Sequence, residues 1–263
     1  MNGPAGVMAL VLAETAAGGV AFLFLTPLWR EVRPGFFYLT GAVVVALAAG
    51  AATTAAGAYE AGAASAGRLA AALAAALGGA TVGWLALMVV KLRSAARVLG
   101  IATVPLAVAM LVAFARTTDE SLALSIFQLL AGALFTGAVL DGLLLGHWYL
   151  TDRKLPRTPI NRMAWLLIGS VVIEAAAVIA GFGSGNASGG SSSNSLNPLL
   201  TVGGSASWIA VGMVACTGLI AAFIRLTLRG NRPTAVQSAT GFFYLAVITA
   251  FTAEIAAKVR LLP

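Results

Sequence analysis

Four carboxylates lie inside otherwise apolar stretches that are long enough to cross a membrane. They are Glu14, Asp141, Glu174 and Glu254. An ionisable side chain in hydrocarbon costs several kcal/mol, so by default it faces the interior of a helical bundle and marks a pathway or a binding site. Carboxyl groups held in this way can transfer protons, hydrogen-bond a quinol or bind a cation. We therefore take these four residues as the candidate proton, quinone or cation pathway.

Depth separates the four carboxylates into two groups. At a helical rise of about 1.5 Å per residue, Glu14 lies roughly 13 Å and Glu174 roughly 12 Å below the outer surface. Glu254 falls near the outer end of its span, and Asp141 falls in the inner half of the fifth span. Because no lysine or arginine stands at matching depth to neutralise the outer three, we expect one or more of them to be protonated at neutral pH. The alternative is that Glu254 reaches the outer surface while Glu14 and Glu174 form isolated hydrogen bonds between helices.

The single histidine, His147, stands in the run Gly146-His-Trp-Tyr149 at the predicted inner edge of the fifth span. We predict that His147, Trp148 and Tyr149 line a headgroup pocket for a quinone or a lipid. The alternative is an interfacial aromatic belt with a solvated histidine. One histidine excludes a haem held by two histidines of this chain. A metal site that joins His147 to Asp141 is not predicted, because residues six apart on a helix point to different faces.

Sequence motifs for self-contained catalysis are missing. The one cysteine, Cys216, rules out an intrachain disulfide and any Cys-x-x-Cys site for zinc, an iron–sulfur cluster or covalent haem. The chain has no HExxH, GxSxG or phosphate-loop pattern in a suitable context. Quinone is the one cofactor that we expect, bound without a covalent link, and whether the chain is an enzyme stays open.

The composition places the chain in the membrane. Sixty per cent of its residues are hydrophobic and 10% are charged, whereas a soluble domain carries about 25% charged residues. About eight apolar stretches use up most of the 263 residues, and each has the roughly 20 residues that cross about 30 Å of hydrocarbon. We predict an all-α, polytopic helical bundle that forms one integral membrane domain over residues 1–263. The predicted spans are 5–29, 36–58, 69–90, 98–115, 122–150, 163–182, 205–224 and 235–257.

Lysine and arginine are concentrated in every second connection between the predicted spans. This alternation predicts how the chain is oriented in the membrane. The even connections hold only Arg68 and Arg116, and the C-terminal tail holds Lys258 and Arg260. Basic residues in short loops stay in the cytoplasm, so we expect a protein of a bacterial cytoplasmic membrane with both termini outside. Spread over four loops, these residues act as topology signals and bind lipid headgroups rather than nucleic acid. The odd connections hold Arg30, Arg33, Lys91, Arg93, Arg97, Arg153, Lys154, Arg157, Arg162, Arg225, Arg229 and Arg232.

Two further features concern the connections and the ends. Residues 183–204 are rich in glycine and serine, which predicts a flexible external loop between spans six and seven. No positively charged region precedes the first apolar run, so we expect that run to be a retained span rather than a cleaved signal peptide.

A weak internal repeat links the two ends of the sequence. The run that begins at Gly35, Gly-Phe-Phe-Tyr-Leu, recurs at Gly241. The helices before these runs also align, with Glu14 opposite Cys216. We predict four helical hairpins that each turn in the cytoplasm, with spans 1–2 and 7–8 most alike. Such a repeat often indicates a site at the interface between repeats, although helices rich in alanine and glycine also resemble one another by composition alone.

Three functions fit these features. The first is an integral membrane subunit of a larger redox or respiratory complex, which anchors other protein subunits and handles quinone or protons. The second is a transporter of a small solute or ion built from repeated hairpins. The third is a lipid-handling or structural membrane protein without chemistry of its own. We take the first as the leading hypothesis and the transporter as its alternative.

The predicted orientation can be tested by labelling. We expect a cysteine introduced at Ser191, with Cys216 replaced by serine, to react with a membrane-impermeant maleimide in intact cells, because the loop that contains Ser191 is predicted to lie outside. A cysteine introduced at Lys154 serves as the control and should react only after the cells are broken. Labelling of position 191 from the cytosol alone would overturn the orientation.

Overall fold

The computed structural model describes residues 3–58, 65–118, 120–152, 154–184, 202–230 and 234–259, and in these residues all regular structure is helical. Eight of the helices are long and apolar enough to cross a membrane, so the predicted polytopic helical bundle is confirmed. Most of the predicted flexible loop, residues 185–201, lies outside the described residues. The helices are α1 (Gly3–Leu25), α2 (Leu28–Glu31), α3 (Pro34–Ala58), α4 (Ser65–Val89), α5 (Arg93–Ala115), α6 (Leu122–Thr151), α7 (Thr158–Ser184), α8 (Val202–Arg229) and α9 (Ala235–Val259).

Apolar side chains and internally satisfied backbones explain why these segments are helices. In hydrocarbon no water can hydrogen-bond the peptide groups, so each span must satisfy them within its own helix. Buried hydroxyl groups follow the same rule, because Thr15 donates to the carbonyl oxygen of Val11 and Thr136 donates to that of Gly132. Pro34 opens α3, where its missing N–H leaves no helical hydrogen bond unmade.

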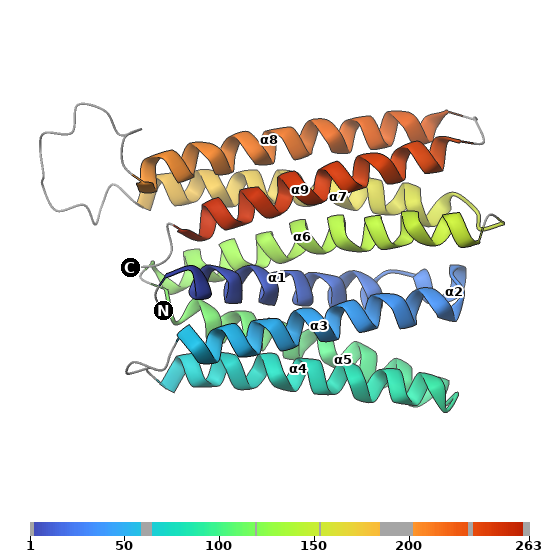
Figure 1. Ribbon diagram of the computed structural model, residues 1–263, viewed down its shortest axis with the longest axis horizontal. Helices are drawn as coiled ribbons and strands as arrows, with labels where there is room; N and C mark the ends of the chain where they lie inside the picture. The colour runs from blue at the N-terminus through green and yellow to red at the C-terminus, as the bar shows by residue number, and fades with distance from the viewer. Residues whose placement is uncertain are drawn as a thin grey trace, which may run out of the picture.

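The eight long helices form two groups of four. In the first half, α1, α3, α4 and α5 pack in sequence and α5 returns to α1. In the second half, α6, α7, α8 and α9 do the same and α9 returns to α6. The two halves lie side by side along their length (Figure 1) and meet mainly where α1 packs against α6. All four predicted hairpins are present, because α1 packs on α3, α4 on α5, α6 on α7 and α8 on α9.

The contact between α1 and α6 brings two backbones together. A Cβ atom added to Gly18 would lie 1.8 Å from the carbonyl oxygen of Ala133, and one added to Gly137 would lie 2.4 Å from the carbonyl carbon of Gly18. Glycine is therefore required at both positions. Lipid is as apolar as leucine, so membrane helices associate through such close approach of small residues.

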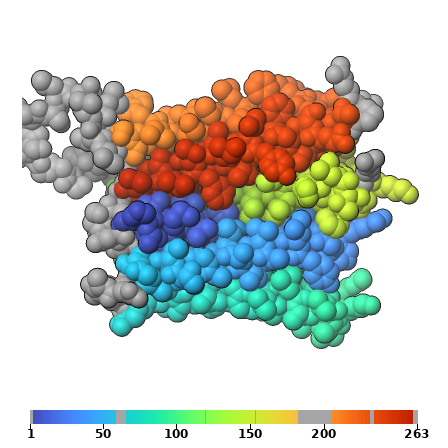
Figure 2. Space-filling model, in the orientation of Figure 1, coloured from blue at the N-terminus to red at the C-terminus, as the bar shows by residue number. Residues whose placement is uncertain are grey.

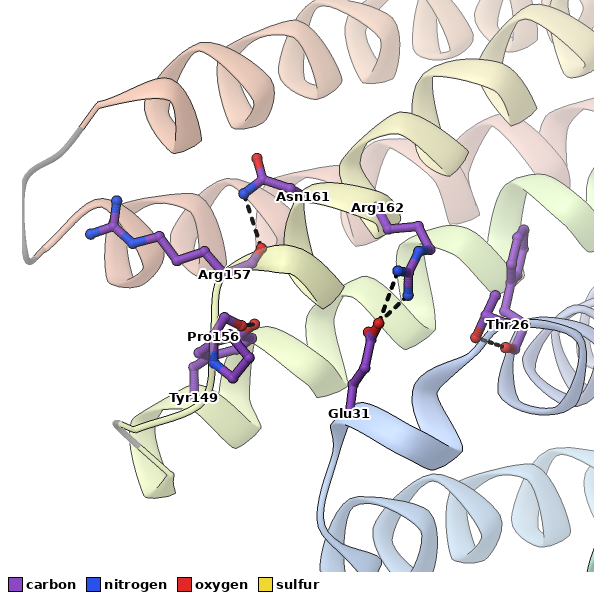
Figure 3. Close-up of polar contacts among 8 residues, drawn as sticks. Thr26, Glu31, Tyr149, Pro156, Arg157, Asn161 and Arg162 are labelled. Atoms are coloured by element: carbon purple, nitrogen blue, oxygen red, sulfur yellow. Dashed lines mark hydrogen bonds and ion pairs between the residues drawn. The ribbon is translucent and has the colours of Figure 1, made fainter.

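Ion pairs join the two halves at the end of the bundle that holds α2. The Arg162 guanidinium donates to both carboxylate oxygens of Glu31 at 2.8 and 3.0 Å (Figure 3). The Nε of Arg33 lies 3.1 Å from Oδ2 of Asp152. Both pairs connect the α2 region to the second half. Exposed ion pairs contribute little to stability, but the two-point geometry of the Arg162 pair fixes how α2 lies against α7.

The two ends of the bundle differ in charge. We call them the α2 end and the terminal end, since α1 begins and α9 ends together at the latter (Figure 1). Among the described residues, the terminal end has only Arg68, Arg116 and Lys258 as basic side chains. Assignment of the α2 end to the cytoplasm stays a prediction. The described basic residues of the α2 end are Arg30, Arg33, Lys91, Arg93, Arg97, Lys154, Arg157, Arg162, Arg225 and Arg229.

The two copies of the sequence repeat, spans 1–2 and 7–8, do not coincide with the two halves of the bundle. Helix α1 is the most buried of the eight spans and packs against helices of both halves. On the face shown in Figure 2, α1 comes to the surface only near the terminal end, between α9 and α3. Helix α8 packs chiefly against α7 and α9. Glu14 is accordingly buried, whereas the aligned Cys216 is exposed.

Adding one methyl group at the α1–α6 contact should destabilise the protein. We expect Gly18→Ala to lower the free energy of unfolding by about 1–3 kcal/mol, the usual cost of overpacking. Thermal unfolding in detergent micelles measures the effect. Gly169→Ala is the matched control, because a Cβ atom there meets nothing within 4 Å. Equal melting temperatures for the two variants would contradict the contact.

Candidate acid–base site between the two halves

Three of the predicted carboxylates converge near the terminal end. Glu14 lies on α1 of the first half, and Glu174 and Glu254 lie on α7 and α9 of the second half. All three are buried. We call these three residues the acidic cluster, and it sits where the two halves meet.

A buried lysine neutralises part of this cluster, so the expectation that no cation stands at its depth is wrong. The Nζ atom of Lys258 lies 2.7 Å from Oε1 of Glu14 and 3.1 Å from Oε2 of Glu254. Read from the sequence, Lys258 belonged to a polar tail. In the structure α9 continues to Val259 and buries the lysine. The signal that could have found it is the i,i+4 spacing of Glu254 and Lys258, which puts both on one helix face.

Gly132 of α6 makes room for two of the carboxyl groups. A Cβ atom added to Gly132 would lie 2.7 Å from Oε1 of Glu14 and 2.8 Å from Oε2 of Glu254. These are the same two oxygen atoms that face Lys258. The backbone of α6 therefore forms one wall of the site, and any side chain at position 132 would displace the ion pairs.

Glu174 belongs to the cluster without direct contact to the ammonium group. Its carboxyl group interacts electrostatically with Glu254, Lys258 and Glu14. Among the described residues, its Oε2 atom has no hydrogen-bond partner. Glu174 is thus the member of the cluster with the weakest compensation.

The charges of the site do not balance. Three carboxyl groups share one ammonium group, and Glu14 Oε2 and Glu254 Oε1 have no partner among the described residues. Burial of an uncompensated charge costs several kcal/mol, even after the protein relaxes around it. The site reaches neutrality only when it also takes up protons or a small cation. This shortage of positive charge is its main chemical property.

Asp141 lies apart from the acidic cluster. It is on α6, nine residues beyond Gly132 toward the α2 end, which corresponds to about 14 Å along the helix. The side chain is fully buried, and neither carboxylate oxygen has a hydrogen-bond partner among the described residues. The structure therefore joins three of the four predicted carboxylates and separates the fourth.

The predicted headgroup residues do not converge on one pocket. His147 is exposed, and the Trp148 ring fills the space beside Gly35 of α3. The Tyr149 hydroxyl donates a hydrogen bond to the carbonyl oxygen of Pro156 (Figure 3). Consecutive residues on a helix point about 100° apart, because a turn takes 3.6 residues. Trp148 therefore packs the two halves together and Tyr149 holds the connection between α6 and α7.

Metal ligation does not explain the cluster. Over the described part of the chain, no three His, Cys, Asp or Glu side chains are close enough to hold a metal ion. The glutamates are arranged around Lys258 instead.

Comparisons of the chain with protein-family models, curated proteins and solved structures found no match. The function must therefore be inferred from the fold and the site themselves. Together they define a polytopic membrane protein whose two four-helix halves enclose a buried cluster of three glutamates and one lysine.

Removal of the ammonium group should destabilise the assembled bundle. We expect Lys258→Met to lower the free energy of unfolding by about 3–5 kcal/mol, the cost of leaving buried charges unpaired. Adding Glu14→Gln to that variant should restore part of the lost free energy of unfolding, since it removes one of the carboxylates left without an ammonium partner. Unfolding by heat and by denaturant in detergent measures both effects.

The exposed Lys91 supplies the control for this substitution. Lys91→Met removes the same charge from the surface and should change stability by less than about 0.5 kcal/mol. If Lys258→Met proved as stable as Lys91→Met, the buried ion pairs would have no structural importance.

Proposed function

We propose that this chain handles protons within the membrane and that Glu14, Glu174, Glu254 and Lys258 form its acid–base site. The observation that carries the proposal is the presence of three buried carboxyl groups beside a single ammonium group, which forms ion pairs with two of them. When the contacts of Lys258 with Glu14 and Glu254 change, such a site must take up or release protons or a small cation. The proton is favoured because, among the described residues, no group of three His, Cys, Asp or Glu side chains could hold a metal ion.

The setting that we propose first is a larger redox or respiratory complex. Membrane-spanning helices take up nearly all of the described residues, so this part of the chain has no room for a soluble catalytic domain. Other protein subunits would carry the electron-transfer chemistry, and this chain would anchor them and deliver or remove protons. Quinone is the proposed reaction partner in this setting, and no pocket for it is assigned to particular residues.

A proton-coupled transporter is the second candidate, and the two-half architecture favours it. In transporters built from repeats, substrate and coupling-ion sites lie at the interface between the repeats. Here the two halves do not follow the sequence repeat, but the acidic cluster likewise lies between two helical bodies, which touch closely at Gly18 and Gly137. Relative movement of the halves about this contact would change the distance between Lys258 and Glu14.

We propose that the α2 end faces the cytoplasm of a bacterial cell, on the strength of its basic residues. The acidic cluster then lies in the outer half of the membrane. Protons would reach it from the external side. Asp141 then lies in the inner half.

Neutral substitutions in the cluster should abolish proton movement. The protein, with any subunits that purify with it, is reconstituted into liposomes that hold a pH-sensitive dye, and a potassium diffusion potential drives proton entry. We expect Glu14→Gln and Glu174→Gln each to reduce the flux about tenfold or more, because removal of an acid–base group typically costs at least that much. Glu120→Gln, between α5 and α6, is the control and should keep the flux.

Size-exclusion chromatography shows whether the variants still assemble. If both variants assemble and both retain the full flux, the acid–base role of the cluster is disproved. Purification in mild detergent separates the two settings, because a complex subunit brings hydrophilic partners with it. A transporter purifies alone and melts at a higher temperature in the presence of its solute.

A further inference from the structure

Asp141 is the one predicted carboxylate that the acid–base site does not use. It lies at a junction of three helices, α1, α3 and α6. A Cβ atom added to Gly19 of α1 would lie 3.1 Å from Cγ2 of Val44, 3.4 Å from Cδ2 of Leu140 and 3.9 Å from Oδ1 of Asp141. The carboxyl group therefore points toward α1, into an apolar surrounding.

No described residue in this surrounding compensates a negative charge on Asp141. The helices that pack on α6 are α1, α3, α5, α7 and α9, and no described basic side chain on them forms an ion pair with Asp141. Neither carboxylate oxygen accepts a hydrogen bond from any described residue. A lone buried carboxylate without a partner is too costly to persist in hydrocarbon. The neutral carboxylic acid is the form that this position accommodates.

A second unpaired polar group lies one turn away on α3. The Thr40 hydroxyl is buried and has no hydrogen-bond partner among the described residues. Other buried threonines, such as Thr136 and Thr240, donate to a carbonyl group of their own helix. Thr40 stands one turn from Val44 toward the α2 end. The Thr40 hydroxyl therefore lies on the α2-end side of the residue of α3 that shares the surroundings of Gly19 with Asp141.

The α1–α6 contact separates Asp141 from the acidic cluster. Gly18 meets Gly137, which lies between Gly132 and Asp141 on α6. The two backbones leave no space for a side chain at that point, and the distance along α6 of about 14 Å is far beyond one hydrogen bond. A proton therefore cannot move from one site to the other in a single hydrogen-bonded step.

We infer that Asp141 is a second proton-binding site, reached from the α2 end, and that the glycine contact keeps it apart from the acidic cluster. The inference rests on the proposed function, which it extends from one site to two. The ligand is a proton rather than a metal ion, because a metal ion needs several oxygen ligands and Asp141 offers one carboxyl group. The outer cluster loads from the terminal end, and Asp141 loads from the opposite end.

Comparison of the infrared spectra of the wild type and its variants, each recorded in H₂O and in D₂O, tests this site directly. A protonated carboxylic acid gives a carbonyl stretching band that shifts in D₂O. We expect Asp141→Asn to remove one such band, and Asp141→Glu to keep a band at a shifted frequency. Glu14→Gln should leave the Asp141 band in place.

Proton flux in the liposome assay is the second readout. We expect Asp141→Asn to reduce the flux about tenfold or more while the bands of the acidic cluster persist, and Asp141→Glu to retain part of the flux. If Asp141→Asn shows every band of the wild type, the inference is overturned. It is also overturned if the proton flux of Asp141→Asn equals that of the wild type. A wild-type protein without flux would refute the proposed function, yet the infrared band would still report on proton binding at Asp141.

Discussion

The structure depends on one constraint, which is the cost of holding three carboxyl groups in hydrocarbon with a single ammonium group. Lys258 can reach Glu14 only if α9 packs close to α1, and this requires the second half to fold back onto the first. Gly132 is the necessary partner of this arrangement, because its missing side chain leaves space for the carboxyl groups. Close packing and charge compensation are therefore two aspects of the same contact between halves.

The two halves are held together differently along their length. At the α2 end, arginine–carboxylate pairs lie at the surface, where water weakens them. In the middle, glycine backbones touch without any polar interaction. Near the terminal end, the ion pairs are fully enclosed. The contact between the halves thus changes from partly exposed ion pairs to close backbone packing and then to buried ion pairs along the bundle.

Much of the fold could be predicted from the sequence because membrane helices are local structures. Hydropathy and span length located all eight helices, and the cost of buried charge identified Glu14, Glu174 and Glu254 as interior residues. What could not be predicted was contact over long sequence distance. Lys258 looked like part of a tail because its partner on α1 lies almost a full chain length away. The role of Gly132 could not be predicted for the same reason, because it depends on Glu14 and Glu254, which lie on other helices.

His147, Trp148 and Tyr149 show a second limit of prediction. Their residue types suggested a pocket, but adjacent helical residues face different directions, and each of the two aromatic residues packs against a different neighbour. Asp141 shows the opposite case. Its burial was predictable from its span, whereas the absence of any partner became visible only when the helices around α6 were placed.

The position of Lys258 in the last turn of α9 also has a consequence for biogenesis. A ribosome delivers α1 to the membrane long before it delivers α9, so Glu14 enters the lipid without its counter-charge. Until α9 arrives, the neutral acid is the form in which Glu14 costs least in lipid. Arrival of α9 then brings the ammonium group to Glu14, so this charge pairing can form only after the helices between α1 and α9 have been delivered.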